Sequence, residues 1–176
     1  MIRPIAAGSL ALTLLVFGLD PATAQSPKQA EAPIGKVMTL EGSATITRKA
    51  VVATVGGVPA PIQAKIDEVV YLGDIIRTTA ASKLGLVFLD GSALNVFANA
   101  ELELDEFAYV PEGKRNSSVF NLVKGTFTVI GGKMAKTGDM RVITTAATLG
   151  IRGTSAHIVV GEDGSVRFST LVEEKQ

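Results

Sequence analysis

The sequence predicts an all-β protein, an irregular β-sandwich or roll whose strands are separated by glycine turns. From about Ile34 onward, apolar and polar residues alternate with the period of two that is typical of half-buried strands. Glycine followed by serine or threonine recurs just before these alternating runs. Beyond the N-terminal segment, no window of about eleven residues shows a capped helical period. A short β-solenoid is the alternative, because similar turns also form the corners of stacked coils.

The alternation defines a predicted core. It is clearest in Glu101–Asp105, where Leu102 and Leu104 point inward and three carboxylates point to solvent. A last alternating run places Val166 and Phe168 on one face. The residues predicted to form the core are Leu84, Leu86, Phe88, Leu94, Val96, Leu102, Leu104, Phe127, Val129, Ala156, Ile158 and Val160.

The recurring glycines are expected to occupy turns, since glycine tolerates the positive φ that turns require and the following hydroxyl can bond nearby backbone. Their spacing is too irregular for a strict solenoid repeat. These dipeptides are Gly42-Ser43, Gly91-Ser92, Gly125-Thr126, Gly153-Thr154 and Gly164-Ser165. Two other stretches are expected to be loops: Val51–Pro61, a hairpin excursion or variable loop, and the polar segment Lys114–Ser118.

One hairpin can be assigned a register from the sequence. A two-residue Asp90-Gly91 turn would place Leu86 opposite Asn95, which breaks the apolar face. A three-residue loop, Leu89–Gly91, with Gly91 in the left-handed conformation, pairs Leu86 with Leu94 and Leu84 with Val96. We therefore predict the three-residue loop, with a solenoid corner at Asp90-Gly91 as the alternative.

Composition excludes several classes of function. Lysine plus arginine and aspartate plus glutamate both number 17, so the net charge is +0 and nothing indicates a nucleic-acid partner. Aromatic residues make up only 5%, which disfavours a stacking platform for bases or sugars. The absence of cysteine excludes a thiolate metal site, a cysteine nucleophile, a disulfide and a lipidated N-terminal cysteine.

The N-terminus has the features of a signal peptide, predicted to be removed after Ala24. Arg3 supplies a positive charge, Ile5–Leu19 is apolar, and Ala22-Thr23-Ala24 is a small-x-small cleavage site. As a helix, the apolar run would span about 22 Å, less than the hydrocarbon core of roughly 30 Å. The expected organisation is a signal peptide (1–24), a flexible linker (25–33) and one β-domain (34–176), located in the periplasm or secreted, with no stable membrane anchor after cleavage.

Residues that could carry chemistry do not form a recognisable catalytic or metal-binding pattern. His157 is the only histidine, and it lies in an alternating run, where a structural or solvent-facing role is expected. No serine lies in a G-x-S-x-G motif, and Gly131-Gly132-Lys133 lacks the rest of a phosphate-binding loop. The sequence therefore predicts no enzyme, no metal and no cofactor.

The segment Ala147–Thr154 stands out because it places Arg152 between Gly150 and Gly153. Two glycines suggest a tight turn that aims the five-donor guanidinium. We expect Arg152 to be a structural anchor, paired with Asp74, Asp90 or backbone carbonyls. The rival hypothesis makes Arg152 an exposed contact for a partner.

Together, five blocks of this sequence resemble the FecR domain family, from about Gly35 to Val160. The blocks are Leu40–Ala44, Val70–Thr78, Phe88–Ser92, Leu122–Gly125 and Thr144–Thr154, and their combination in this order is specific. The motif residues, for which the resemblance implies an architectural role, are Gly73, Asp74, Arg77, Asp90, Gly91, Ser92, Gly125, Gly150, Arg152, Gly153 and Thr154.

The resemblance implies an all-β extracytoplasmic domain with no catalytic residues. Its best-known members relay a signal from an outer-membrane receptor to a sigma factor through a cytoplasmic segment and a membrane helix, where this chain instead carries the predicted cleavable signal. We expect a protein-interaction module that binds another envelope protein in signalling or assembly. The alternative is a secreted structural or surface scaffold. The sequence leaves the identity of the partner and the oligomeric state open.

Overall fold

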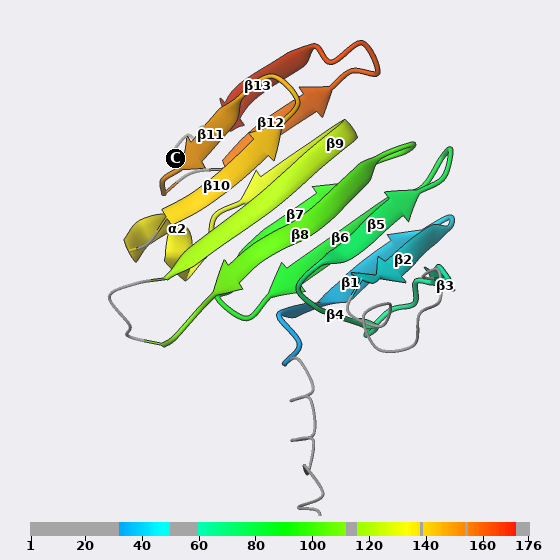
Figure 1. The fold of residues 1–176 in the computed structure, drawn as a ribbon, viewed down its shortest axis with the longest axis horizontal. Coiled ribbons are helices and arrows are strands. Elements are labelled where there is room, and N and C mark those ends of the chain that lie inside the picture. Colours follow the sequence, from blue (N-terminus) through cyan, green and yellow to red (C-terminus); the bar gives the residue numbers. More distant parts are fainter. Residues whose placement is uncertain (1–31, 50–59, 112–115, 138, 154, 172–176) are drawn as a thin grey trace, which may run out of the picture. The chain divides into compact units, whose positions relative to one another are not determined.

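The computed structural model describes residues 32–49, 60–111, 116–137, 139–153 and 155–171 (Figure 1). They belong to one compact unit, Glu31–Gln176. The expected signal peptide, most of the expected linker and most of the Val51–Pro61 loop lie outside the described residues, as does Thr154. The signal peptide and the 34–176 boundary therefore stay predictions.

The predicted all-β class is confirmed, since the described ranges contain thirteen strands and one helix of 5 residues. In chain order these elements are β1 (Gly35–Glu41), β2 (Ala44–Arg48), β3 (Ile62–Gln63), β4 (Val69–Val70), β5 (Asp74–Thr78), β6 (Lys83–Phe88), β7 (Ala93–Val96), β8 (Glu101–Ala108), β9 (Ser117–Ile130), α2 (Lys133–Thr137), β10 (Asp139–Thr144), β11 (Thr148–Ile151), β12 (Ser155–Val160) and β13 (Val166–Leu171). The expected polar loop at Lys114–Ser118 is too long, because β9 already begins at Ser117.

The strands form two sheets that share β9. Sheet A has the order β4-β1-β6-β7-β9-β12-β13, and sheet B has the order β3-β2-β5-β8-β9-β10-β11. The first half of β9, up to Lys124, pairs with β8 and β10 in sheet B. Its second half, Gly125–Ile130, pairs with β12 in sheet A, where β7 lies on the other side. One long strand therefore belongs to both layers (Figure 1).

The strand directions favour a roll over the solenoid alternative. Strand pairs in the described part of the chain are antiparallel, except for the parallel pair of β9 and β10. Coils of a solenoid stack their strands in parallel, so the observed pattern is that of an antiparallel sheet folded over on itself.

The core lies between the two sheets. Each core residue that the alternation predicts is buried, with an exposure of 3% or less. Phe88 of sheet A and Phe120 of sheet B have ring centroids 4.8 Å apart, so the inner faces are in direct contact. Phe107 extends this aromatic contact, 5.7 Å from Phe88. The apolar burial that stabilises the fold is therefore shared by both layers.

The predicted register of the hairpin between β6 and β7 is confirmed. Leu84 lies opposite Val96 and Leu86 lies opposite Leu94. The loop is Leu89–Gly91, closed by a 2.9 Å hydrogen bond from the Phe88 N–H to the Ser92 carbonyl, and Gly91 has φ of 80°. Preserving one apolar face was therefore the correct criterion for choosing between the two loop lengths.

Four of the five glycines that precede serine or threonine lie between strands, as predicted, whereas the turn predicted at Gly125 is wrong. All five have positive φ, between 68° and 109°. Four of the following strands begin directly after the dipeptide, at Ala44, Ala93, Ser155 and Val166. Gly125 is different because it lies within β9, at the point where this strand passes from sheet B to sheet A.

Four of the passages between the sheets are joined to one another by backbone hydrogen bonds. They are Gly42–Ser43, Thr79–Ser82, Phe97–Ala100 and Lys124–Thr126, which we call the corner row. The Thr79 N–H donates to the Ser43 carbonyl at 3.0 Å, and the Asn99 N–H donates to the Thr79 carbonyl at 3.2 Å. The Phe97 N–H donates to the Thr126 carbonyl at 3.0 Å. Backbone groups that leave the sheets at these bends therefore remain paired.

Candidate functional site: the signature junction

The acidic residue of the hairpin loop, Asp90, is bound from several sides. Its side chain is buried, with 1% exposure. Oδ1 accepts hydrogen bonds from the Ser92 N–H at 3.0 Å and the Ser92 hydroxyl at 2.6 Å. Oδ2 accepts one from the Met134 N–H at 3.2 Å, and the Asp90 carbonyl accepts one from the Lys133 N–H at 3.0 Å. Asp90 thus joins the β6–β7 loop to the start of α2.

The same short helix also contacts the glycine–arginine block. The Gly153 N–H donates a 2.9 Å hydrogen bond to the Ala135 carbonyl. Met134 and Ala135 are fully buried. We call Asp90–Ser92, Gly132–Ala135 and Gly153 the signature junction. It brings together two sequence blocks that are about sixty residues apart, and α2 is the connection that the sequence did not reveal.

Gly132 fits this junction because no side chain is present. A Cβ built at this position would lie 2.7 Å from the Asp90 carbonyl oxygen and 2.7 Å from the Gly91 carbonyl carbon. Real Cβ atoms do not approach backbone this closely. Gly131-Gly132-Lys133 is therefore a packing segment that presses against the hairpin loop, in agreement with its rejection as a phosphate-binding loop.

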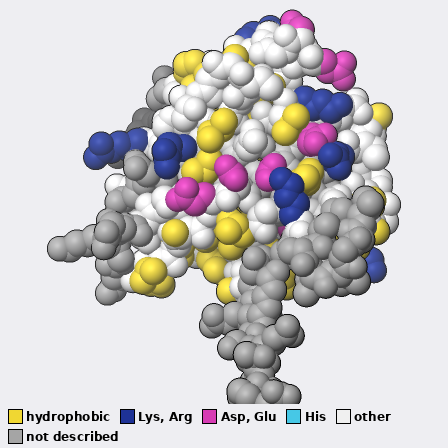
Figure 2. Space-filling view, in the orientation of Figure 1, with side chains coloured by type: hydrophobic (Ala, Val, Ile, Leu, Met, Phe, Trp, Pro, Cys, Tyr) yellow, Lys and Arg dark blue, Asp and Glu magenta, His cyan; other side chains and the backbone are white. Residues whose placement is uncertain are grey.

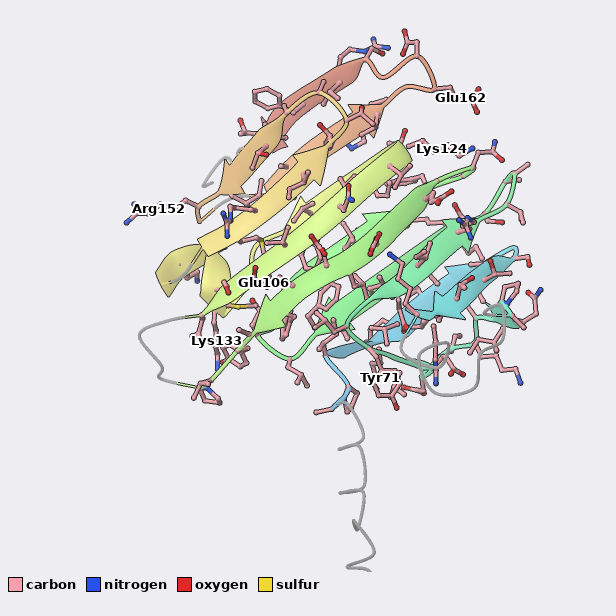
Figure 3. The ribbon with its side chains drawn as sticks, viewed as in Figure 1. Tyr71, Glu106, Lys124, Lys133, Arg152 and Glu162 are labelled. Carbon is pink, nitrogen blue, oxygen red and sulfur yellow. The ribbon has the colours of Figure 1, made fainter. Side chains whose placement is uncertain are left out.

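The prediction that Arg152 is an anchor paired with Asp74, Asp90 or backbone carbonyls is wrong. Figure 3 shows the Arg152 side chain extending away from the sheets, and the residue is exposed. Asp90 is already bound to Ser92 and Met134. Asp74 accepts a 2.9 Å hydrogen bond from the Tyr71 N–H. Both carboxylates thus accept hydrogen bonds from backbone N–H groups of their own domain.

The two glycines around Arg152 also differ from each other. Gly153 has the positive φ expected of a turn, 68°. Gly150 lies in β11, opposite Arg141, and is not among the residues with positive φ. An added Cβ would meet nothing within 4 Å at either position. Only Gly153 of these two glycines therefore has the backbone conformation of a turn, and the exposed Arg152 lies between Gly153 and the end of β11.

Gly73 and Arg77, two further motif residues, make contacts within the domain. Gly73, with φ of 79°, occupies a turn closed by a 3.2 Å hydrogen bond from the Asp74 N–H to the Tyr71 carbonyl. Arg77 lies on the outer face of sheet B and forms a 2.7 Å ion pair with Glu101. The hydrogen bond with Glu101 holds the pKa of Arg77 above its ordinary value, with burial acting in the opposite direction.

The carboxylates of β8 lie on a solvated face, as predicted. Glu101 pairs with Arg77, and Glu103 pairs with Lys49. Asp105 is exposed. Figure 2 shows acidic and basic side chains intermixed over this side of the domain. Such exposed pairs contribute little to stability, and their mixture of signs creates no single-sign field for a charged ligand.

His157 has the structural surroundings expected of it. Its Nδ1 lies 3.1 Å from the Thr128 hydroxyl, and its ring meets the edge of Phe97 at a centroid distance of 6.3 Å. No three metal-ligating side chains converge within the described ranges. A depression of about 330 Å³ beside Lys124 is open to solvent and holds the Lys124–Glu162 ion pair of 3.8 Å (Figure 3).

No helix in the part of the chain that the structure describes has both the length and the apolar character needed to span a bilayer.

The hairpin between β12 and β13 repeats the β6–β7 loop. Its loop is Glu162–Gly164. A 2.8 Å hydrogen bond from the Gly161 N–H to the Ser165 carbonyl closes the loop, and the Asp163 carboxylate accepts a 3.0 Å hydrogen bond from the Ser165 N–H. The Ser165 hydroxyl and this N–H hold the pKa of Asp163 below its ordinary value. Asp163 is exposed, whereas Asp90 is buried.

These observations define a class of protein: an all-β roll whose signature residues serve its turns and junctions. Comparison with known families agrees, because the family model described as FecR protein matches residues 74–172, more than half of the chain. The chain belongs to the FecR family, which is generally involved in envelope and transmembrane signalling. The match begins later than the expected Gly35 and continues beyond Val160. No curated protein and no solved structure gives a significant match.

Proposed function

We propose that this protein is an exported FecR module that binds another envelope protein, in signalling or in assembly, and that it has no enzymatic activity and takes no cofactor. Family membership supports a role in envelope signalling. The signal-peptide features of residues 1–24 support export. A secreted structural scaffold is the alternative, and deposition outside the cell would favour it.

The observation that carries the proposal is the contrast within the signature blocks. Asp74 and Asp90 are buried and bind backbone N–H groups of their own domain. Arg152 is exposed on a turn that Gly153 ties to α2. A guanidinium held this way offers a planar, multidentate donor to a carboxylate or a row of carbonyls on another protein.

Arg152→Ala is expected to abolish partner binding while changing the free energy of unfolding by no more than about 0.5 kcal/mol, as is usual for exposed residues. The measurement is recovery of a specific envelope protein by the tagged chain, together with urea unfolding. Arg141→Ala is the matched control, because Arg141 is also exposed, on β10. Unchanged recovery with Arg152→Ala, or equal loss with Arg141→Ala, would reject the contact.

Export is tested separately. Mass spectrometry of the protein from the envelope or medium should find a mature chain that begins at Gln25, since cleavage follows Ala24. Replacing Ala24 with a bulky residue should block this cleavage, because the processing site requires small side chains. An intact N-terminus in the membrane fraction would contradict the proposal and support a membrane-anchored signalling protein.

A further inference from the structure

The outermost strands of the two sheets differ in how well they resist pairing with another chain. β3 and β4 have 2 residues each, and β11 has 4 residues and contains Gly150. β13 has 6 residues, contains no proline or glycine, and pairs with β12 without a bulge. Long, regular edge strands without protecting features are templates for strand addition. Within the described ranges, β13 is the least protected edge.

An exposed aromatic side chain lies on this strand. Phe168 pairs with Ile158, which is fully buried, so both side chains lie on the inner face of sheet A. Phe168 is nevertheless 63% exposed, because β13 is the last strand of its sheet. The sequence correctly placed Val166 and Phe168 on one face, but the edge leaves Phe168 uncovered. A neighbouring strand would cover it.

The hydrogen-bond phase of β13 shows which backbone groups face the open edge. The Gly161 N–H donates to the Ser165 carbonyl, so this pair is of the hydrogen-bonded type. Bonded and non-bonded pairs alternate in an antiparallel ladder. Arg167 and Ser169 therefore bond to β12, whereas the N–H and C=O groups of Val166, Phe168 and Thr170 point to the open edge.

We infer that β13 pairs with β13 of a second copy of this chain, antiparallel and about a two-fold axis at Phe168. In this register Phe168 lies opposite Phe168 of the second copy, and Val166 lies opposite Thr170. All three outward pairs are then of the bonded type, which gives roughly six hydrogen bonds. The two phenyl rings lie on the same face and cover each other.

Charge does not oppose pairing with a second copy. In the same register, Arg167 lies opposite Ser169 of the second copy, so the two arginines do not face each other. A symmetric contact of this kind is self-complementary and closes as a dimer, because it uses the β13 edge of both copies. Sheet A of each copy would join into one continuous sheet. This association is independent of the envelope partner proposed for Arg152, which lies outside β13.

The test is the mass of the purified protein in solution across a concentration series, by sedimentation equilibrium. We expect a reversible dimer. Phe168→Lys should raise its dissociation constant by at least about tenfold. Thr170→Pro should do the same while keeping the bonds to β12, since the lost N–H faces the open edge. Circular dichroism checks that both variants fold. Leu89→Lys is the matched control, because Leu89 is also 63% exposed but lies in a loop.

A cysteine probe tests the register. The chain has no cysteine, so Phe168→Cys adds a single thiol next to the axis. Bonded antiparallel pairs have Cα atoms about 5.5 Å apart, a spacing that a disulfide can bridge. Oxidation should give a disulfide dimer, and Leu89→Cys should not. A monomer at every concentration would overturn the inference, as would a dimer that tolerates both Phe168→Lys and Thr170→Pro. Loss of envelope binding by Arg152→Ala without loss of the dimer would show the two surfaces to be separate.

Discussion

Gly125→Ala is expected to lower the free energy of unfolding by on the order of 4 kcal/mol, from backbone strain and a steric clash together. Gly125 has φ of 109°, a conformation that side chains strain. A Cβ at this position would lie 2.5 Å from the Ala100 Cα and overlap the Ala100 Cβ. Because both partners belong to the corner row, neither can move without breaking bonds between the sheets. Urea unfolding with the linear extrapolation measures the loss.

Two other glycines separate the two causes. Gly91→Ala introduces strain alone, since φ is 80° and nothing lies within 4 Å of the added Cβ. It should cost about 1–2 kcal/mol. Gly150→Ala adds neither strain nor a contact and should change stability by less than about 0.5 kcal/mol. Equal losses for Gly125→Ala and Gly91→Ala would show that the corner tolerates the added methyl group.

Asp90→Ala is the second large effect, an expected loss of on the order of 3 kcal/mol. The substitution removes the acceptors for the Ser92 N–H, the Ser92 hydroxyl and the Met134 N–H, in surroundings where Asp90 is only 1% exposed. Buried donors left without a partner bear their full desolvation cost. Thermal or urea unfolding measures the change. Asp90→Asn keeps one oxygen acceptor, so its stability should lie between that of the unchanged protein and that of Asp90→Ala.

The repeated hairpin provides the control. Asp163 accepts the Ser165 N–H just as Asp90 accepts the Ser92 N–H, but Asp163 is exposed and its loop receives no bond from α2. Asp163→Ala should therefore lower stability much less than Asp90→Ala, because water replaces the lost acceptor. A similar cost at both positions would mean that the turn itself, and not the signature junction, is what Asp90 stabilises.

Features that depend on local pattern could be predicted from the sequence. Period-two alternation identified the core, since each strand buries one face. The register of Leu84–Leu86 against Leu94–Val96 followed from keeping that face intact. The turn glycines followed from a conformational preference that needs no knowledge of the rest of the chain.

Features that depend on contacts between residues far apart in the chain could not be predicted from the sequence. The helix α2 has only 5 residues, too few to show a helical period. Its bond to Asp90 joins residues 44 apart in sequence, and nothing near Asp90 signals Met134. The ion pair expected of Arg152 was wrong for a different reason: its side chain is exposed, and both candidate carboxylates accept backbone N–H groups of nearby residues. Whether an arginine serves the domain or faces outward depends on what the folded neighbours leave unoccupied.

The sharing of β9 sets the order in which the domain can be completed during synthesis. Strands β7 and β8 precede β9 in the chain, and β10 and β12 follow it, yet all four pair with it. Before residue 130 is available, each layer lacks its middle strand. Contacts between such distant segments form slowly, because long loops must close first. The two sheets are therefore expected to fold together, at a late stage, once β9 is available to both.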